Sequence, residues 1–389
     1  MTIRLSLTAP PVTPRNCQGT VRVRDRLEWR VGDPGDPAAL AEEFLTLHRM
    51  PAADLSLLPG GSCPGGPTGS LCGAAVLLSG AGGAAAIGAP TGAPSPAPAV
   101  PDLAVVVYEH CPPVAPEEPG GWRLGAWAPS WSTRQHAEAV ASVRAAIGRG
   151  DVYQVNVVGH WSASYVGDPS AALARVAAIE GAVYGGVLSG DGWAVACASP
   201  ETLVSVAAGR VESRPIKGTR PATEQGRREL LASAKERAEH IMIVDLVRND
   251  LALVARTGSV RVEELFALRR WVGLWQAESV VAAELAGGVG LAGLLRAVAP
   301  GGSVTGAPKR AALAQVARLE RVGRGPSMGA VGFVSPYRLD LGLTIRTVAA
   351  DAGRVHVWAG GGITWGSEPA AEVAEAAAKA GPIFGALRG

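Results

Sequence analysis

The sequence predicts an α+β fold with mainly antiparallel sheet. Runs that alternate between apolar and polar residues come in hairpin-like groups, and helical patterns separate these groups. One such run, at 203–206, is followed by a hairpin turn at Ala208-Gly209. The chain has 389 residues, of which 48% are hydrophobic and 18% charged, so it can bury a large core and is not disordered.

The first 125 residues predict few elements and form a divergent N-terminal region. Asp36-Pro37 predicts the start of a helix that runs to Met50, and residues 104–108 read as a strand. Between them, residues 59–101 are rich in glycine and proline and predict a long irregular loop. The apolar part, 74–100, is read as loop and not as a membrane span, because glycine and proline break helices and small side chains bury little area. We identify no chemistry in this region.

From about residue 130 the patterns become regular. Ser132 and Thr133 can cap a helix that ends at Gly148, and Asp168-Pro169 can open another that carries Ile179. The remaining expected helices are 227–247, 308–319 and 369–380. The expected strands are 152–158, 193–198, 203–206, 328–334, 343–348 and 355–359.

Composition excludes several classes of function. A formal net charge of +2 gives no electrostatic reason to expect a nucleic acid or a membrane as partner. The five cysteines are scattered without a CxxC pair, which predicts neither zinc nor a redox centre and favours a reducing, cytoplasmic location. Only four of the 36 basic residues are lysines, at 217, 235, 309 and 379. A lysine kept among arginines indicates a role that a guanidinium cannot fill, or chance survival on the surface.

Two predicted helices each carry a pair of glutamates three residues apart. These pairs are Glu236 with Glu239, and Glu372 with Glu375. Residues at i and i+3 share one helical face, so two such pairs facing each other would suit a hard divalent cation, Mg²⁺ above all. The alternative is two solvated faces, with Glu375 and Lys379 forming an ordinary ion pair.

Two glycine clusters and one arginine could bind an anion. The segment 300–309 (PGGSVTGAPK) leads into a helix, and 359–369 (AGGGITWGSEP) lets backbone approach a ligand. Neither matches a P-loop or GxGxxG, and both could be ordinary loops. Arg346 is expected mid-strand, where it needs an internal acid or a substrate carboxylate. Lys217, in RPIKGT, lies at an apolar strand end where desolvation favours the neutral, nucleophilic amine; a snorkelling structural lysine is the alternative.

Taken together and in order, the motifs resemble the chorismate-utilising enzymes. They are DVYQVN at 151–156, SPE at 199–201, RPIKGT at 214–219, KERAEHIMIVDLVRNDL at 235–251, PGGSVTGAPK, IRT at 345–347 and AGGGI with the last glutamate helix. The resemblance covers roughly residues 130 to 385, and so many ordered motifs are highly specific. It implies a catalytic region over 130–389 and a fold of two large antiparallel β-sheets packed face to face with helices outside.

The resemblance also implies roles for individual residues. Glu239 and Glu375 match the glutamates that hold Mg²⁺, which binds a carboxylate of chorismate, and Glu236 and Glu372 match their companions. Glu201 matches an acid that assists proton movement. The remaining positions match groups around the substrate: Gly218, Thr219, Thr305, Gly306, Arg346, Gly360, Gly361, Gly362 and Lys379.

Lys217 indicates the branch of the family. Anthranilate synthases resemble PIAGT at this place, whereas aminodeoxychorismate synthase component I, of p-aminobenzoate and folate biosynthesis, carries PIKGT. The resemblance to that enzyme implies Mg²⁺-dependent amination of chorismate at C4 through a covalent Lys217 adduct. A glutamine amidotransferase subunit would be the partner that supplies ammonia.

Two positions depart from the family pattern. Gln276 stands where relatives have a catalytic histidine, and Ser327 where they usually have a tyrosine. Glutamine cannot act as a general acid or base. Three alternatives therefore stay open: anthranilate synthase component I, another chorismate aminase or isomerase, and a non-catalytic chorismate-binding homologue.

Overall fold

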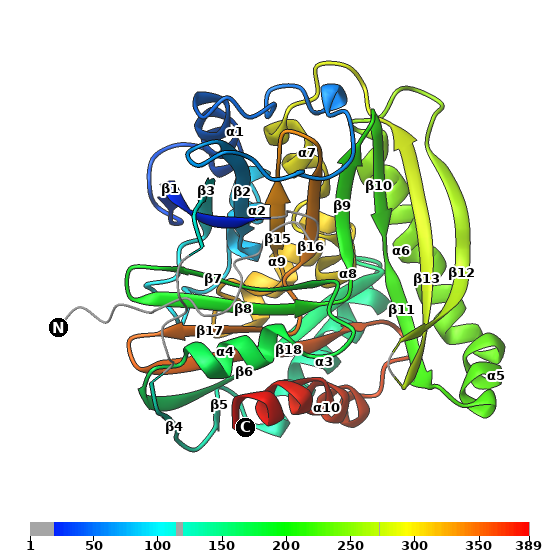
Figure 1. Ribbon diagram of the computed structural model, residues 1–389. Helices are drawn as coiled ribbons and strands as arrows, with labels where there is room; N and C mark the ends of the chain where they lie inside the picture. The colour runs from blue at the N-terminus through cyan, green and yellow to red at the C-terminus, as the bar shows by residue number, and fades with distance from the viewer. Residues whose placement is uncertain (1–18, 114–119, 272, 389) are drawn as a thin grey trace.

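The computed structural model describes residues 19–113, 120–271 and 273–388 of the chain. Within these residues the strands form two sheets, one of ten strands and one of eight, and the ladders between the named strands are antiparallel. The predicted fold class is thereby confirmed (Figure 1). None of the helices in these ranges combines the length and apolar character needed to cross a bilayer.

The ten-stranded sheet combines strands from residues 20–111 with strands from residues 202–343. Its order is β1-β3-β2-β15-β16-β9-β10-β13-β11, and β12 also pairs with β13. Its strands are β1 (Thr20–Trp29), β2 (Leu71–Leu78), β3 (Leu103–Cys111), β9 (Thr202–Ala207), β10 (Arg210–Arg214), β11 (Ile216–Pro221), β12 (Arg261–Trp271), β13 (Leu274–Glu284), β15 (Ala330–Val334) and β16 (Leu339–Leu343). The predicted hairpin turn between β9 and β10 is present, with positive φ at Ala208 and Gly209.

The eight-stranded sheet has the order β14-β6-β18-β17-β8-β7, and two short strands, β4 and β5, also pair with β6. Its strands are β4 (Trp122–Leu124), β5 (Ala128–Pro129), β6 (Gln154–Gly167), β7 (Tyr184–Gly190), β8 (Trp193–Ser199), β14 (Gly306–Ala307), β17 (Thr347–Asp351) and β18 (Arg354–Ile363). The long β6–β18 ladder is its centre, and ten residues of β18 pair with β6.

The helices flank the sheets. They are α1 (Pro37–Leu47), the 3₁₀ turn η1 (Leu55–Leu57), α2 (Gly80–Ala86), α3 (Thr133–Gly148), α4 (Ser170–Ala177), α5 (Glu224–Ala232), α6 (Ala234–Ala252), α7 (Leu291–Val298), α8 (Gly302–Thr305), α9 (Lys309–Leu319) and α10 (Pro369–Arg388). The expected cap of α3 is present, because Ser132 and Gln135 form a reciprocal capping box.

Strand β8 shows how the two sheets share a core. Trp193, Val195 and Cys197 belong to a cluster that also contains the inward residues of β2, β3 and β9. Ala194 and Ala196 point to the opposite face, where they pack with residues of α4 and α10. The two sheets therefore pack face to face, and these helices cover the outer face of the eight-stranded sheet (Figure 1).

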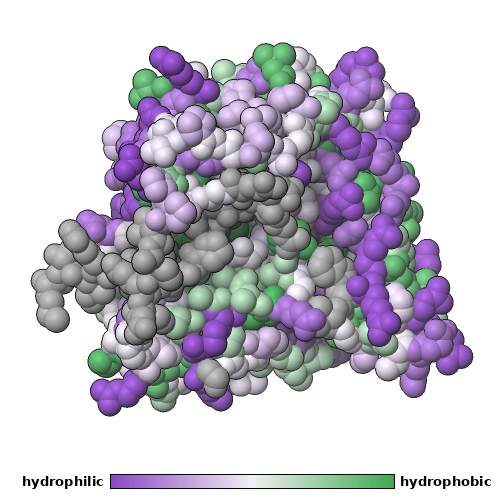
Figure 2. Space-filling view, viewed as in Figure 1, coloured by the Kyte–Doolittle hydropathy of each residue, from purple (hydrophilic) through white to green (hydrophobic). Residues whose placement is uncertain are grey.

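The outer surface is mostly polar. Hydrophilic side chains gather on the side of the molecule that carries β12 and α5 (Figure 2). Strand β12 lies outside the main strand path of its sheet and carries charged side chains. Its Glu263 pairs with Arg210 of β10 at 2.6 Å, and its Arg269 pairs with Glu264 of the same strand. Charged side chains at a sheet edge hinder edge-to-edge association.

The predicted loop over 59–101 is wrong for residues 71–86. Seven of the eight residues of β2 are buried, so its run of small apolar residues is a strand covered on both faces. Helix α2 is built from glycine and alanine because larger residues do not fit: a Cβ at Gly82 would lie 2.8 Å from the carbonyl oxygen of Asp102. The small side chains that led us to predict a loop here instead allow the strand and the helix to pack closely.

Two further predictions need correction. The helix expected over 227–247 is two helices, because Ser233 has extended backbone (ψ 101°) and its hydroxyl caps the N–H of Glu236. The strand expected over 343–348 is interrupted: Arg346 lies between β16 and β17 with φ 51°, so it is not mid-strand. The boundary between an N-terminal region ending at 125 and a catalytic region beginning at 130 stays a prediction, and residues 1–18 and 114–119 lie outside the described residues.

Candidate active site

Lys217 lies on β11 at a break in the ladder with β13. The register shifts between Lys217 and Thr219, and Gly218, the extra residue, has φ 76°. Such a bulge re-aims the neighbouring side chain. A Cβ atom at Gly362 of β18 would lie 3.3 Å from Lys217 Nζ, so the amine reaches across from one sheet to the three consecutive glycines on a strand of the other. Two motifs that are 145 positions apart thus meet here.

The surroundings of Lys217 favour its neutral form. Burial is the main cause that lowers the pKa of the Lys217 amine, and the charge of Lys379 lowers it further. Glu201, Glu239 and Glu375 act in the opposite direction without reversing the shift. Three carboxylates therefore surround an amine that loses its proton more easily than an ordinary lysine does.

Glu201, at the end of β8, is buried with only 6% exposure. Its Oε1 accepts a hydrogen bond of 2.8 Å from the Ser303 hydroxyl. Burial raises the pKa of Glu201 to about 7, and this outweighs the lowering by Ser303 and Lys217. The carboxyl can therefore take or release a proton near neutral pH.

The glutamates on α6 have partners around the same site. Glu239 accepts a hydrogen bond of 3.1 Å from the hydroxyl of Thr364, which follows β18, and lies 3.7 Å from the ammonium of Lys235. Burial raises the pKa of Glu239, although these neighbours and Lys217 oppose the shift. Glu236 lies 3.4 Å from the guanidinium of Arg220 and faces Gly218, where a Cβ would be 3.2 Å from its Oε2.

The glutamates on α10 differ from each other in exposure and partners. Glu375 forms the expected ion pair with Lys379 at 2.7 Å, and both side chains are about half exposed. Burial raises the pKa of Glu375, but Lys379 and Lys217 outweigh it and the net pKa is lowered. Glu372 is buried and, among the described residues, its carboxylate has neither an ion pair nor a hydrogen bond. It lies against Gly361, where a Cβ would be 3.0 Å from its Oε2.

Mg²⁺ held by two of these carboxylates stays a prediction that their number and chemistry allow. Within the described ranges, no three of the four glutamates bring their oxygens within 4.8 Å of one another. Mg²⁺ usually binds one or two carboxylates and completes its shell with water and substrate oxygens. The unpartnered carboxylate of Glu372 fits the same prediction, because a buried carboxylate without a partner is stabilised by a nearby cation.

A group of buried polar atoms without partners lies where the substrate is expected. Thr305, at the end of α8, is fully buried, and its hydroxyl has no hydrogen-bond partner among the described residues. The same holds for both side-chain amide atoms of Gln154 on β6. Gln154 lies beside Gly362, where a Cβ would be 2.6 Å from its amide nitrogen. Unpartnered buried polar groups indicate a missing ligand or water. The sequence analysis did not predict a role for Gln154, although this residue lies in the DVYQVN motif.

Glycines are required where these segments meet. Gly306 has φ 129°, and a Cβ there would lie 2.1 Å from the carbonyl oxygen of Gln154. Gly360 lies just as close to β6, with 2.0 Å between its Cβ position and the carbonyl oxygen of Val157. The carbonyl oxygen of Gly360 also accepts a hydrogen bond of 3.1 Å from Lys379 Nζ. Any side chain would push the strands apart.

Arg346 is half-buried in the turn between β16 and β17. Burial lowers the pKa of its guanidinium, and no acid in the described part of the chain forms an ion pair with it. The internal acid that we offered as one explanation of Arg346 is therefore not found in this part, and the guanidinium is available to an external anion.

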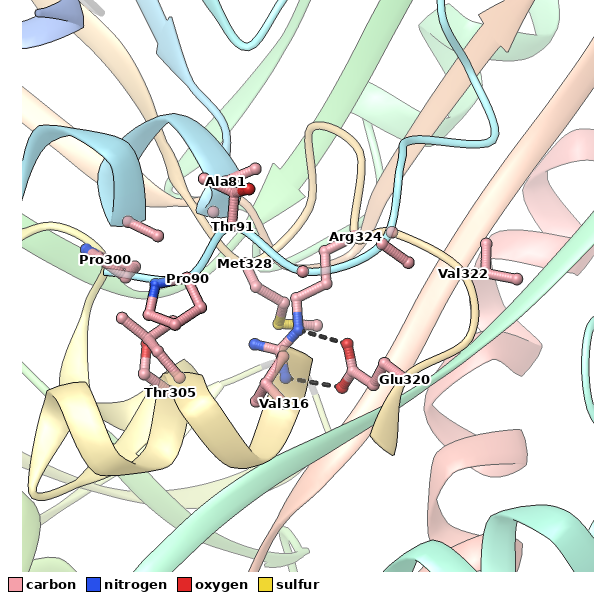
Figure 3. A pocket seen from close by; sticks show the side chains of 16 residues that line it. Ala81, Pro90, Thr91, Pro300, Thr305, Val316, Glu320, Val322, Arg324 and Met328 are labelled. Atoms are coloured by element: carbon pink, nitrogen blue, oxygen red, sulfur yellow. Dashed lines mark hydrogen bonds and ion pairs between the residues drawn. The ribbon is translucent and has the colours of Figure 1, made fainter. Parts of the chain in front are cut away.

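A buried ion pair fixes the segment that carries Thr305. Arg324 and Glu320 lie 2.7 Å apart, and Arg324 also donates to the carbonyl oxygens of Val304 at 2.9 Å and Asn156 at 2.8 Å. Figure 3 shows this pair beside a pocket of about 400 Å³ that reaches Thr305 from the α2 side. A second pocket, of about 340 Å³, is lined by Glu201 and Ser303. Lys217 and the four glutamates line neither pocket, so each pocket borders only a part of the candidate active site.

Gln276 is buried on β13, directly opposite Thr219 of β11. A histidine that we had not singled out lies nearby, His240 on α6. Its Nε2 is 2.5 Å from the Ser279 hydroxyl, and its buried Nδ1 has no partner among the described residues. Burial, with a smaller contribution from Lys217, lowers the pKa of His240 to about 4, so its ring is neutral. The two other lysines pair with acids, Lys235 with Glu239 and Lys309 with Asp250 at 2.9 Å.

Known proteins resemble this chain in sequence and in fold. The family model described as chorismate binding enzyme matches residues 86–385. Aminodeoxychorismate synthase component 1 of Klebsiella aerogenes is 38% identical over 257 residues, which is 64% of this chain and 57% of that protein. Anthranilate synthase component 1 of Streptomyces coelicolor is 38% identical over 284 residues, 71% of this chain and 56% of that protein. The match thus spans little more than half the length of these relatives.

Solved structures share the fold. Anthranilate synthase component I from Streptococcus pneumoniae superposes with a TM-score of 0.75 at 22% identity, covering 94% of this chain and 91% of that one. The menaquinone-specific isochorismate synthase from Escherichia coli gives a TM-score of 0.67 at 15% identity, with 95% of both chains covered. At these identities the likeness concerns the fold alone.

Proposed function

The chain belongs to the chorismate-binding enzyme family, and we propose that it acts as component I of an aminodeoxychorismate synthase. It would aminate chorismate at C4 with ammonia from a glutamine amidotransferase subunit. The observation that carries the proposal is the Lys217 amine, whose pKa is lowered by burial and whose Nζ lies 3.3 Å from the Cβ position at Gly362. Anthranilate-type members have an alanine at this place, so a reactive amine here favours the 4-amino product.

The proposed reaction has two displacements. The lone pair of neutral Lys217 Nζ forms a C–N bond to the chorismate ring, and the C4–O bond breaks. Glu201, with a pKa of about 7, supplies the proton with which the hydroxide leaves as water. Ammonia then forms a bond to C4, the bond to Lys217 breaks and the lysine amine is released, and the proton lost by the added nitrogen returns to Glu201. The net change is chorismate plus ammonia to aminodeoxychorismate plus water.

The remaining residues would bind and orient the substrate. Arg346 and the hydroxyl of Thr305 would contact one carboxylate, because neither has a side-chain partner in the described part of the chain. Glu239 and Glu375 would hold Mg²⁺, with Glu236 and Glu372 beside them. When bound, that ion would neutralise a substrate carboxylate among these acids.

A second candidate function is anthranilate synthase component I. The Streptomyces coelicolor relative of that name is as similar as the aminodeoxychorismate synthases and covers more of this chain. Identity alone therefore does not choose between them. In this candidate, Lys217 would act through its charge and not as a nucleophile.

One experiment separates these functions. The purified full chain is incubated with chorismate, Mg²⁺ and ammonium, and the products are identified by mass and chromatographic mobility. We expect aminodeoxychorismate, formed only when Mg²⁺ is present. Anthranilate as the main product would establish the second candidate. If chorismate binds but is not consumed, even with an amidotransferase subunit added, the protein is a non-catalytic homologue and the proposal is wrong.

A further inference from the structure

Three potential metal ligands meet in the N-terminal part of the fold. The sulfur atoms of Cys63 and Cys72 and a ring nitrogen of His110 all lie within 4.8 Å of one another. The three residues are buried, with exposures of 4%, 0% and 3%. Cys63 Sγ is 3.4 Å from His110 Nε2. Such a cluster of thiols and an imidazole is the ligand set that Zn²⁺ prefers.

The local structure directs all three side chains to one point. Cys72 is the extra residue of a bulge in the β2–β3 ladder, because the register shifts between Leu71 and Gly73. His110 belongs to β3, and its backbone N–H is bonded at 2.9 Å to the carbonyl oxygen of Ser70, just before β2. The bulge therefore re-aims Cys72 toward the face on which the His110 ring lies.

The imidazole of His110 is closely surrounded. A Cβ at Gly19 would lie 3.2 Å from its Nδ1, and a Cβ at Gly66 would lie 3.2 Å from its Cδ2. The ring is thus wedged between two glycines, with Nε2 directed at Cys63. A fixed ring with one nitrogen aimed at two sulfur atoms is what a preorganised metal site requires.

Cys63 lies on a long irregular connection. Between η1, which ends at Leu57, and β2, which begins at Leu71, the chain has no regular secondary structure. Connections of this length are uncommon in compact domains unless something anchors them. Backbone hydrogen bonds hold both ends of this connection, for example from Gly60 to Tyr337 and from Gly69 to His110. Cys63 lies between these ends and is buried, so a bond from its sulfur to a shared ion would anchor the middle of the connection.

We propose that Cys63, Cys72 and His110 bind a structural zinc ion that fastens the 58–70 connection to the paired strands β2 and β3. Tetrahedral zinc with Zn–S and Zn–N bonds of about 2.3 and 2.0 Å separates a sulfur from a nitrogen ligand by roughly 3.6 Å. The 3.4 Å between Cys63 Sγ and His110 Nε2 is close to this spacing. Zinc would displace the thiol protons, and the fourth position would be filled by a water molecule or another residue.

The proposed site is separate from the candidate active site. Its residues come from β2, β3 and the connection before β2, and none of these segments carries a residue of the candidate active site. The proposal therefore does not depend on which reaction the enzyme catalyses. A simple S–H···N hydrogen bond and a Cys63–Cys72 disulfide are the two competing explanations of the cluster.

The test measures metal content in the full chain, produced without a metal-affinity tag. We expect about one zinc per chain in the wild type by mass spectrometry of the metal, and almost none in Cys63→Ser or His110→Ala. The matched control is Cys111→Ser, adjacent to His110 but outside the cluster, which retains the metal. Removal of the ion by a strong chelator lowers the Tm of the wild type and leaves the Tm of Cys63→Ser unchanged.

A second measurement uses the wild type alone and therefore tests the proposal even when the variants fail to fold. Wild-type protein reloaded with Co²⁺ shows thiolate-to-cobalt charge-transfer absorption and the visible bands of tetrahedral cobalt. A metal-free wild type that takes up neither zinc nor cobalt overturns the proposal in favour of the hydrogen bond. A non-reduced chain that is lighter by two hydrogens, with Cys63 and Cys72 on one cross-linked peptide, overturns it in favour of the disulfide.

Discussion

Replacing Thr305 with valine removes a buried hydroxyl that has no hydrogen-bond partner among the residues that the structure describes. A buried hydroxyl without a hydrogen bond costs about 1–3 kcal/mol, and valine has nearly the same shape. We therefore expect the free energy of unfolding to rise by about 1 kcal/mol. In a chain of this length that corresponds to a Tm increase of about 1 °C. If the hydroxyl donates to a substrate carboxylate, the same change weakens binding by about 1.5–3 kcal/mol, or roughly 10- to 150-fold in Kd.

The chain offers a matched control in Thr344, which is also fully buried. Its hydroxyl accepts a hydrogen bond of 2.6 Å from the N–H of Gly329, so Thr344→Val leaves that donor unsatisfied. We expect this variant to lose about 1–3 kcal/mol of stability with little change in chorismate affinity. Chemical denaturation and calorimetric titration with chorismate and Mg²⁺ measure both quantities. If Thr305→Val is destabilised like the control and binds chorismate normally, the hydroxyl of Thr305 is not a substrate ligand.

Three further predictions concern the surrounding groups. Glu239→Gln and Glu375→Gln keep the fold, as judged by circular dichroism, but lose the Mg²⁺-dependent part of chorismate binding in calorimetry; wild-type Mg²⁺ dependence in either variant contradicts the metal assignment. Because the pKa of Glu201 is raised from 4.5 to about 7, the folded chain binds its proton more tightly and wild-type stability falls as pH rises through this window. Glu201→Gln therefore gains up to about 3 kcal/mol relative to wild type between pH 4.5 and 8 in parallel denaturant titrations, and a difference independent of pH refutes the shift. Gly362→Ala places a Cβ 3.3 Å from Lys217 Nζ and 2.6 Å from the side-chain amide nitrogen of Gln154, so we expect turnover to drop about 100-fold. The control Gly366→Ala has no atom within 4 Å of its Cβ and keeps wild-type turnover.

The regular part of the fold could be predicted because its signals are local. Helix α3 has its capping box at Ser132 and Gln135 within four residues, and β6, β8 and β9 show apolar runs of strand length. That the two sheets pack face to face does not follow from such patterns. The face-to-face packing was implied by the resemblance that the ordered motifs carry. The alternation of β8 side chains between the two faces explains this packing only when the elements on each face are known.

Small residues and turns caused the main errors. The strand β2 and the helix α2 are rich in glycine and alanine, which predict loops by propensity but here allow close packing. Arg346 lies between two apolar runs that look like one strand, and only its φ of 51° shows that the chain turns there. Such a conformation leaves little trace in the sequence when the residue is not glycine.

Only some residues of the candidate site could be predicted from the sequence. Lys217 and the glutamates could be found because each lies in a specific motif. Gln154 and His240 lie in quoted motifs too, but only their unpartnered buried atoms single them out. The cluster of Cys63, Cys72 and His110 was missed because its ligands are spread over three segments, so no short spacing reveals it.

The central claim is that Lys217 forms a covalent bond to the substrate, and intact-protein mass spectrometry tests it most directly. The wild-type chain is mixed with chorismate and Mg²⁺ in the absence of any ammonia source. The account predicts a mass increment of one chorismate less one water, mapping to the peptide that contains Lys217. Lys217→Arg keeps the positive charge but has no neutral amine, so it should show neither the adduct nor 4-amino product, as should Lys217→Met. No adduct in the wild type, together with C4 amination retained by Lys217→Arg, would contradict the account and leave Lys217 an electrostatic role.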